Sequence, residues 1–178
     1  TANKQHEPEL LEVGQELLQR FRFRTGYKPD AHRLARVVQA CLTGKDAAPI
    51  AAGIARELRR AIAAHEIHSS VNRNLLKALL TVQAQVVSDA LFEGSEDERR
   101  AGVKAFDRRS SASDEISCSE LIAWCNQDGE ARFPLAASFI TFAYRPEING
   151  PQIWSDQAMV LLLNAPDFRS VLAEFVRR

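Results

Sequence analysis

The 178-residue sequence lacks the short motifs of the common enzyme classes. It contains no G-x-x-x-x-G-K-[ST] phosphate-binding loop, no G-x-G-x-x-G dinucleotide turn and no G-x-S-x-G nucleophile elbow. These motifs supply the local apparatus for nucleotide binding and for the usual hydrolase chemistry. We therefore expect no catalytic residues, no cofactor and no enzyme activity in this chain.

Cysteine is scarce as well. Cys41, Cys118 and Cys125 are an odd number of thiols without C-x-x-C spacing, so the sequence encodes neither a disulfide framework nor a zinc site. Buried free thiols are the expected state. Cys118 and Cys125 lie seven residues apart, which places them on one face of a helix. A Cys–His nucleophile pair would need a histidine close to one of them in the fold, and the sequence leaves that open.

The segment His65-Glu66-Ile67-His68 carries two imidazoles three residues apart. It lacks the i, i+4 spacing of H-E-x-x-H, and the sequence shows no recognisable third ligand. We interpret it as a helix end or loop and expect no metal site.

Long apolar runs are missing too. No stretch approaches the roughly 18 to 20 consecutive apolar residues that cross a bilayer, and the N-terminus has no basic-then-apolar signal pattern. With 46% hydrophobic and 7% aromatic residues, the composition is that of a globular protein. We expect a cytoplasmic protein without membrane contact, and we interpret a chain that opens at Thr1 as a fragment of a longer one.

No charge of one sign dominates. The net charge is zero: residues 1–92 carry 13 Lys and Arg against 9 Asp and Glu, and residues 93–178 carry 10 against 14. A protein that binds phosphate backbones would show a larger basic excess, so nucleic acid is an unlikely partner. An alternative nucleic-acid surface would use the arginines of residues 20–36 and 56–60, namely Arg20, Arg22, Arg24, Arg33, Arg36, Arg56, Arg59 and Arg60.

The sequence is rich in helical periodicity. Apolar residues recur three to four positions apart in every apolar stretch, which predicts an all-α protein of eight or nine helices in sequential antiparallel pairs. The first helix spans residues 9–23 and the most apolar one residues 71–92, whose two apolar stripes predict contacts on two sides. Arg56, Arg59 and Arg60 form a charged face that we expect to be solvated. Expected capping residues are Asp30, Asp46, Ser95 with Glu98, Ser117 with Glu120, Asp128 and Ser155.

Residues 119–143 organise the chain: two short apolar runs flank a break at Asn126-Gln127-Asp128-Gly129, which predicts two helices joined by a tight turn. Residues 90–106 repeat this pattern 33 positions earlier, a period typical of stacked helical hairpins. The paired positions are Leu91 and Trp124, Ser95 and Asp128, Arg99 and Arg132, Val103 and Ala136, and Phe106 and Phe139. We predict that the two hairpins superpose and that Phe106 and Phe139 are buried.

These residues carry a resemblance to a known family. Asp128 followed by Ala131-Arg132 and Ala136-Ala137 resembles the turn and second helix of HEAT-type repeats, and Ser95, Arg99 and Ala101 fit the same frame. Pro134 and Gly102 depart from the family's pattern. The resemblance implies a short α-solenoid in which turn Asp and Arg side chains hold neighbouring repeats in register and a concave surface binds a partner. The residues around Trp124 and Trp154 also resemble helical-repeat regions of large bacterial proteins.

The function that we expect follows from this architecture. Residues 1–178 would form a single helical-repeat domain, a protein-interaction or scaffold module of a larger bacterial protein. Its partner would be a protein or another domain of the same chain, and the sequence does not fix its oligomeric state.

Overall fold

The computed structural model describes residues 7–24, 30–67, 72–106, 112–144 and 151–177. The structure is 77% helical, and nine α-helices account for most of the described residues. The prediction of an all-α protein is therefore confirmed. The chain forms two compact units, Thr1–Ala105 and Phe106–Arg178. A single repeat domain over residues 1–178 stays a prediction.

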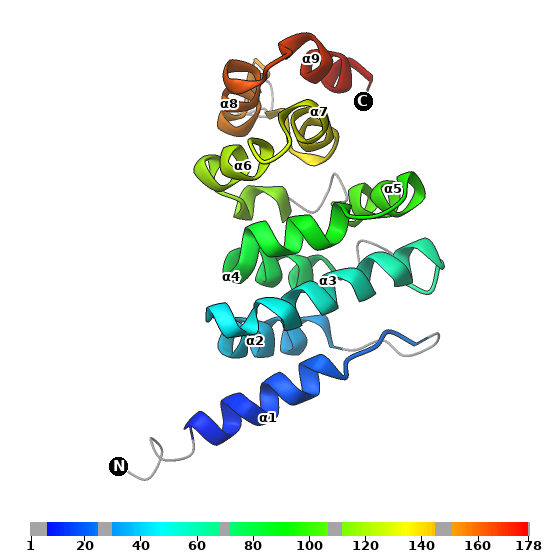
Figure 1. Ribbon diagram of the computed structural model, residues 1–178, viewed down its shortest axis with the longest axis vertical. Coiled ribbons are helices and arrows are strands. Elements are labelled where there is room, and N and C mark those ends of the chain that lie inside the picture. The colour runs from blue at the N-terminus through cyan, green and yellow to red at the C-terminus, as the bar shows by residue number, and fades with distance from the viewer. Residues whose placement is uncertain (1–6, 25–29, 68–71, 107–111, 145–150, 178) are drawn as a thin grey trace. The chain divides into compact units, whose positions relative to one another are not determined.

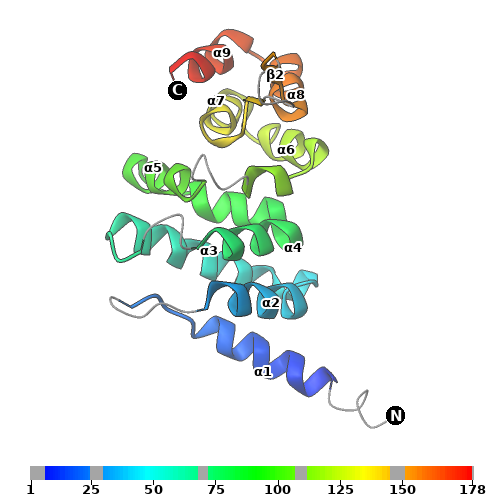
Figure 2. The ribbon, with the colours of Figure 1, turned by 180° about the vertical axis from the view of Figure 1, so that it is seen from behind.

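The first unit is built around one buried helix. It contains α1 (Glu7–Gln19), α2 (Ala31–Cys41), the short 3-10 turn η2 (Lys45–Ala47), α3 (Ala48–Ala63), α4 (Arg73–Phe92) and α5 (Glu96–Ala105). Helix α4 packs against α2, α3 and α5, while α1 packs against α2 and α3 (Figures 1 and 2). Both predicted stripes of α4 contribute to the core, which confirms contacts on two sides: Leu75, Leu76, Leu79, Leu80, Val87, Ala90 and Leu91 are buried.

Helix α4 is kinked at Gln83, where the backbone is non-helical (φ −150°, ψ 51°). The Gln83 side chain donates hydrogen bonds to the carbonyls of Leu42 (3.2 Å) and Gly44 (2.8 Å), at the end of α2. Arg73–Phe92 is also long and apolar enough to cross a membrane by composition and length, although 61% of the tested window is buried inside the structure. The search for 18 to 20 consecutive apolar residues does not select this helix, because polar residues interrupt its apolar run.

The predicted caps are largely present. Asp30 accepts hydrogen bonds from the backbone of His32 and Arg33, Asp128 and Ser155 cap α7 and α8, and both capping boxes form. Asp46 is the exception. It lies within η2, and Ala47 occupies the N-cap of α3 without a side-chain bond, because the 3-10 turn leads directly into that helix.

The second unit contains the 3-10 turn η4 (Ala112–Glu115), α6 (Cys118–Cys125), α7 (Gly129–Phe139), β1 (Ala143–Tyr144), β2 (Ile153–Trp154), α8 (Asp156–Asn164) and α9 (Phe168–Arg177). Helix α6 packs against α7 and α8, and α7 and α8 pack against α9. The two strands pair antiparallel, Ala143 with Trp154 and Tyr144 with Ile153. We predicted no strand, since two residues are too few to show alternation.

Aromatic rings fill much of the second unit. Phe106 and Phe139 are both buried, as predicted, and stack with centroids 4.4 Å apart. Trp124 is buried beside them, whereas Trp154 is 41% exposed with its ring 5.8 Å from that of Phe175. The sequence predicts that Leu161, Leu162 and Leu163 bury the helix that Ser155 caps. In the structure Leu161 is buried and Leu162 half-buried, but Leu163 is 77% exposed, because α8 turns that position toward solvent.

Candidate docking surface

One side of α1 is both apolar and exposed. In the sequence the large apolar residues of the helix predicted over residues 9–23 keep the three-to-four spacing of an amphipathic helix: Leu10, Val13, Leu17, Leu18 and Phe21. In the structure Leu18 alone of the α1 stripe is buried, while Leu10 is 69%, Val13 53% and Leu17 66% exposed. The spacing of these three residues places them in one line along the helix.

This line forms one wall of a groove in the first unit. Helix α2 supplies the other wall, and Gly14 and Cys41 lie between them. The groove has a volume of about 590 Å³ and is lined by Leu10, Val13, Gly14, Leu17, Arg33, Arg36, Val37, Ala40 and Cys41. A concave, mainly apolar surface between two helices is the kind of site that receives an amphipathic helix.

Close packing and hydrogen bonds hold the two walls together. A Cβ atom built on Gly14 would lie well inside van der Waals contact of the Cys41 sulfur, so glycine allows α1 to approach α2 closely. Gln15 donates from Nε2 to the Cys41 carbonyl (2.9 Å). Beyond the helix, the backbone N–H of Phe23 donates to Glu57 Oε1 of α3 (2.9 Å). The groove is therefore preformed.

The groove is basic along its α2 wall. Its two ionisable lining side chains apart from Cys41 are Arg33 and Arg36. Arg33 contacts Asp30 at 3.3 Å, and this pair is largely exposed to solvent. Burial raises the pKa of the Cys41 thiol, which keeps it protonated and neutral. An occupant with apolar side chains and a carboxylate flank would match these walls.

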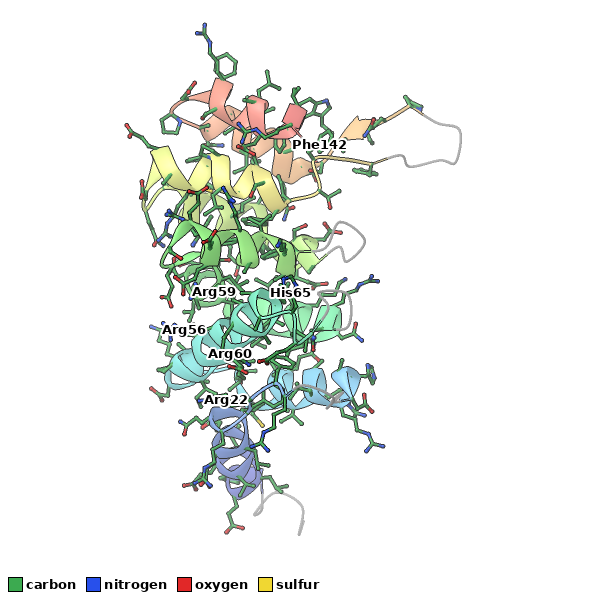
Figure 3. All side chains as sticks on the ribbon, turned by 90° about the vertical axis from the view of Figure 1, so that its right-hand side faces the viewer. Arg22, Arg56, Arg59, Arg60, His65 and Phe142 are labelled. Carbon is green, nitrogen blue, oxygen red and sulfur yellow. The ribbon has the colours of Figure 1, made fainter. Side chains whose placement is uncertain are left out.

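The arginines of α3, labelled in Figure 3, were predicted to form a solvated face, and this holds for Arg56 and Arg60, which are exposed, but not for Arg59. The Arg59 side chain is only 9% exposed. It donates from Nη1 to the Glu93 carbonyl at the end of α4 (2.6 Å), and its Nη2 lies 3.2 Å from Glu98 Oε1. The guanidinium donates hydrogen bonds to carbonyl groups at the C-terminal end of α4. The negative end of the α4 helix dipole stabilises its positive charge.

The neighbouring arginines are paired with carboxylates. Arg56 binds Glu93. Arg60 binds Glu57 (2.8 Å) and Glu66 (2.7 Å). The positive charge of residues 56–60 is therefore largely compensated inside the first unit.

The predicted repeat positions take varied roles. Ser95 forms the capping box of α5 with Glu98, whereas the Arg99 side chain is exposed. Asp128 accepts from the Ala131 N–H at the start of α7. The backbone N–H groups of Arg99 and Arg132 donate to the carbonyls of Ser95 and Asp128 (3.0 and 2.8 Å), so the two turns share this bond.

Arg132 ties α7 to the end of α6. Its Nη1 donates to the Trp124 carbonyl (3.2 Å) and to Gln127 Oε1 (2.8 Å), and its guanidinium lies 4.8 Å from the centroid of the Trp124 ring. At the end of α4 it is Arg59 of α3 that donates to the corresponding carbonyls. The 33-residue repeat in the sequence therefore does not extend to this side-chain role. The roles of these residues as repeat positions stay predictions.

The histidines considered for metal binding lie at the end of α3 or beyond it. His65 is exposed with φ 56°, and it closes α3 through bonds from its N–H to Ile62 and from the Glu66 N–H to Ala61. His68 lies outside the described residues. Within the searched part of the chain, no group of three or more His, Cys, Asp or Glu could hold a metal ion.

The cysteines of α6 differ in exposure. Burial raises the pKa of the Cys125 thiol to about 12, and its sulfur lies 3.7 Å from the Arg132 carbonyl. Cys118 is half-buried and lines a pocket of about 470 Å³ in the second unit. Polar groups of that pocket serve the fold: Ser155 caps α8, and Gln157 donates to the carbonyls of Ser113 and Ile116 (2.7 and 2.6 Å).

No protein-family model, no curated protein and no solved structure matches the chain.

Sequence reasoning missed the groove, although one signal was present. Helix α1 begins with an apolar side too wide for one interface: Leu10, Leu11, Val13, Leu17 and Leu18 cover more of its circumference than the contact with α2 and α3 uses.

Proposed function

We propose that this chain is a protein-interaction module of a larger protein that binds a partner protein, or another domain of its own chain, through the groove between α1 and α2. The observation that carries the proposal is the exposed line of Leu10, Val13 and Leu17. Fully burying such side chains contributes about 1.5–3 kcal/mol each, and a contiguous exposed apolar patch marks an interaction site.

The packing inside each unit supports the repeat architecture that we propose for the module. Helices two positions apart in the chain pack together: α1 with α3, α2 with α4, α3 with α5, α6 with α8, and α7 with α9. Stacked helical hairpins produce this pattern, since each element contacts its counterpart in the next layer. A HEAT-like α-solenoid is therefore the architecture that we propose.

The nucleic-acid alternative has less support. Arg56, Arg59 and Arg60 are engaged with carboxylates and backbone carbonyls, and Arg20 and Arg33 pair with Glu16 and Asp30, which lowers the positive charge available for phosphate contacts. We expect no binding of duplex or single-stranded DNA or RNA at physiological salt, measured by fluorescence anisotropy. Arg36→Glu is the suitable probe, because Arg59→Glu would place an acid at the buried end of α4.

Site-specific photo-crosslinking tests the proposal. The full-length protein would carry a photoreactive phenylalanine analogue at Leu17, in the cells that produce it, with the same analogue at Leu163 as the matched control. Leu163 is also an exposed apolar helix residue, 77% exposed on α8. We expect a specific protein adduct from position 17 and none from position 163. Absence of an adduct from position 17, or the same adducts from both, would contradict the proposal.

A further inference from the structure

We propose that the occupant of the groove is α1 of a second copy of this chain, in a two-fold dimer in which each α1 lies over the α2 wall of the other copy. This inference rests on the proposed function, for which it names the partner. Its support comes from the charge and the apolar pattern of the groove itself.

The charge of the groove selects an acidic occupant. The lining carries Arg33 and Arg36 and no carboxylate. Helix α1 is the acidic element of the first unit: between Glu7 and Gln19 it has four glutamates and neither Lys nor Arg. Glu12 and Glu16 are exposed; Glu16 pairs with Arg20 of its own chain on the open surface, where its carboxylate can also meet a cation of another molecule. Oppositely charged rims steer two copies together and penalise other arrangements.

The apolar pattern of α1 also fits the groove. Leu10, Val13 and Leu17 recur at i, i+3 and i+7 and extend over about 10 Å of helix. These are the anchor spacings with which a helix fills a groove between two others. In the second copy they would meet Val37 and Ala40 of α2, which line the groove.

A two-fold axis makes each contact occur twice. In such an interface a residue pair in one direction is repeated in the other. With the axis parallel to α1, the outer, acidic side of one α1 lies against the outer side of the partner's α2. Glu16 of one copy then faces Arg36 of the other in both directions, and the apolar lines lie between these charged rims.

Another helix with exposed apolar side chains, α9, fits less well. On α9, Phe168, Leu172 and Val176 are 54%, 38% and 81% exposed. Helix α9 also carries two basic residues, Arg169 and Arg177, and one acidic residue, Glu174. A net positive helix would bring like charges against Arg33 and Arg36. The groove therefore favours α1 over α9 as its occupant.

Sedimentation equilibrium of the 178-residue chain tests the dimer. We expect a monomer–dimer equilibrium that shifts toward dimer as the concentration rises. Leu17→Asp should raise the dissociation constant at least about tenfold, and Val37→Glu on the opposite wall should do the same. Leu163→Asp is the matched control and should leave the dimer unchanged. Far-UV circular dichroism verifies the helix content of each variant.

A charge exchange tests the two-fold arrangement. Glu16→Arg and Arg36→Glu should each weaken self-association, because each places like charges at both rims. An equimolar mixture of the two variants should dimerise more strongly than either alone, since both of its rim contacts become attractive.

The outcomes separate the two proposals. A wild-type chain that stays monomeric, a dimer that survives both Leu17→Asp and Val37→Glu, or a mixture no stronger than its components would overturn the dimer. A monomeric chain whose position-17 photoprobe captures a different protein would also overturn the dimer, while leaving the proposed function in place.

Discussion

Gly14 and Cys41 pack closely where the two walls of the groove meet. The effect of Gly14→Ala on the free energy of unfolding should therefore change sign with the residue at position 41. In Gly14→Ala the new methyl group overlaps the Cys41 sulfur. Overpacking of this kind costs about 1–3 kcal/mol. Replacing a glycine inside a helix by alanine gains about 1 kcal/mol. We therefore expect Gly14→Ala to lower the free energy of unfolding by up to about 2 kcal/mol.

Removing the sulfur should reverse this effect. In a Cys41→Ala background the nearest remaining atom to the new methyl is the Cβ of residue 41, at 3.6 Å, which is ordinary van der Waals contact. Gly14→Ala should then stabilise the chain by about 1 kcal/mol, the helix-propensity gain alone. The coupling between the two substitutions should be about 1–3 kcal/mol.

Urea unfolding of the wild type, the two single variants and the double variant, followed by far-UV circular dichroism, measures this cycle. Peptide-level hydrogen exchange locates the change in α1. If Gly14→Ala has the same effect in both backgrounds, the close approach of α1 to α2 does not exist as described.

Three further predictions concern single residues. Arg132→Ala should lower the melting temperature, with a loss of about 1–3 kcal/mol, because the charged donor to both the Trp124 carbonyl and Gln127 Oε1 is removed, while the Gln127 N–H still donates to that carbonyl; unchanged stability would assign Arg132 to a binding face. His65→Gly should raise the free energy of unfolding by about 1 kcal/mol, seen as a higher urea midpoint, since glycine adopts positive φ without strain; a lower midpoint would contradict the role of His65 in ending α3. Burial alone would raise the pKa of Glu57, but hydrogen bonds from Arg60 and from the Phe23 N–H outweigh it and lower that pKa. Its stabilisation is therefore present above the unfolded value of about 4.5 and is lost as the pH falls toward the folded value. A pH titration of the urea midpoint checks this, and Glu57→Gln should flatten the decline.

Local features of the fold could be predicted from the sequence. Caps such as Asp30 and the box of Ser117 with Glu120 depend on residues two or three positions apart, so a short stretch of sequence contains both partners of each bond. The two stripes of α4 were predictable for the same reason. The kink at Gln83 was not, because it depends on carbonyls some 40 residues away, at Leu42 and Gly44.

The candidate site could not be predicted, because exposure is a property of the whole fold. The spacing of Leu10, Val13 and Leu17 is the same whether their helix face is covered or open. Arg56, Arg59 and Arg60 look alike in the sequence, yet Arg59 alone reaches the carbonyls at the end of α4. Its burial depends on a helix that begins more than ten residues later.

The central claim is that the α1–α2 groove is occupied in the working protein. Side-chain footprinting measures this directly: the full-length protein is labelled by a short carbene or hydroxyl-radical pulse in its native cell extract and, separately, as dilute purified protein. We predict that Leu10 and Leu17 are labelled several-fold less in the extract, while Leu163 is labelled equally in both. Equal labelling of Leu10 and Leu17 under the two conditions would contradict the claim.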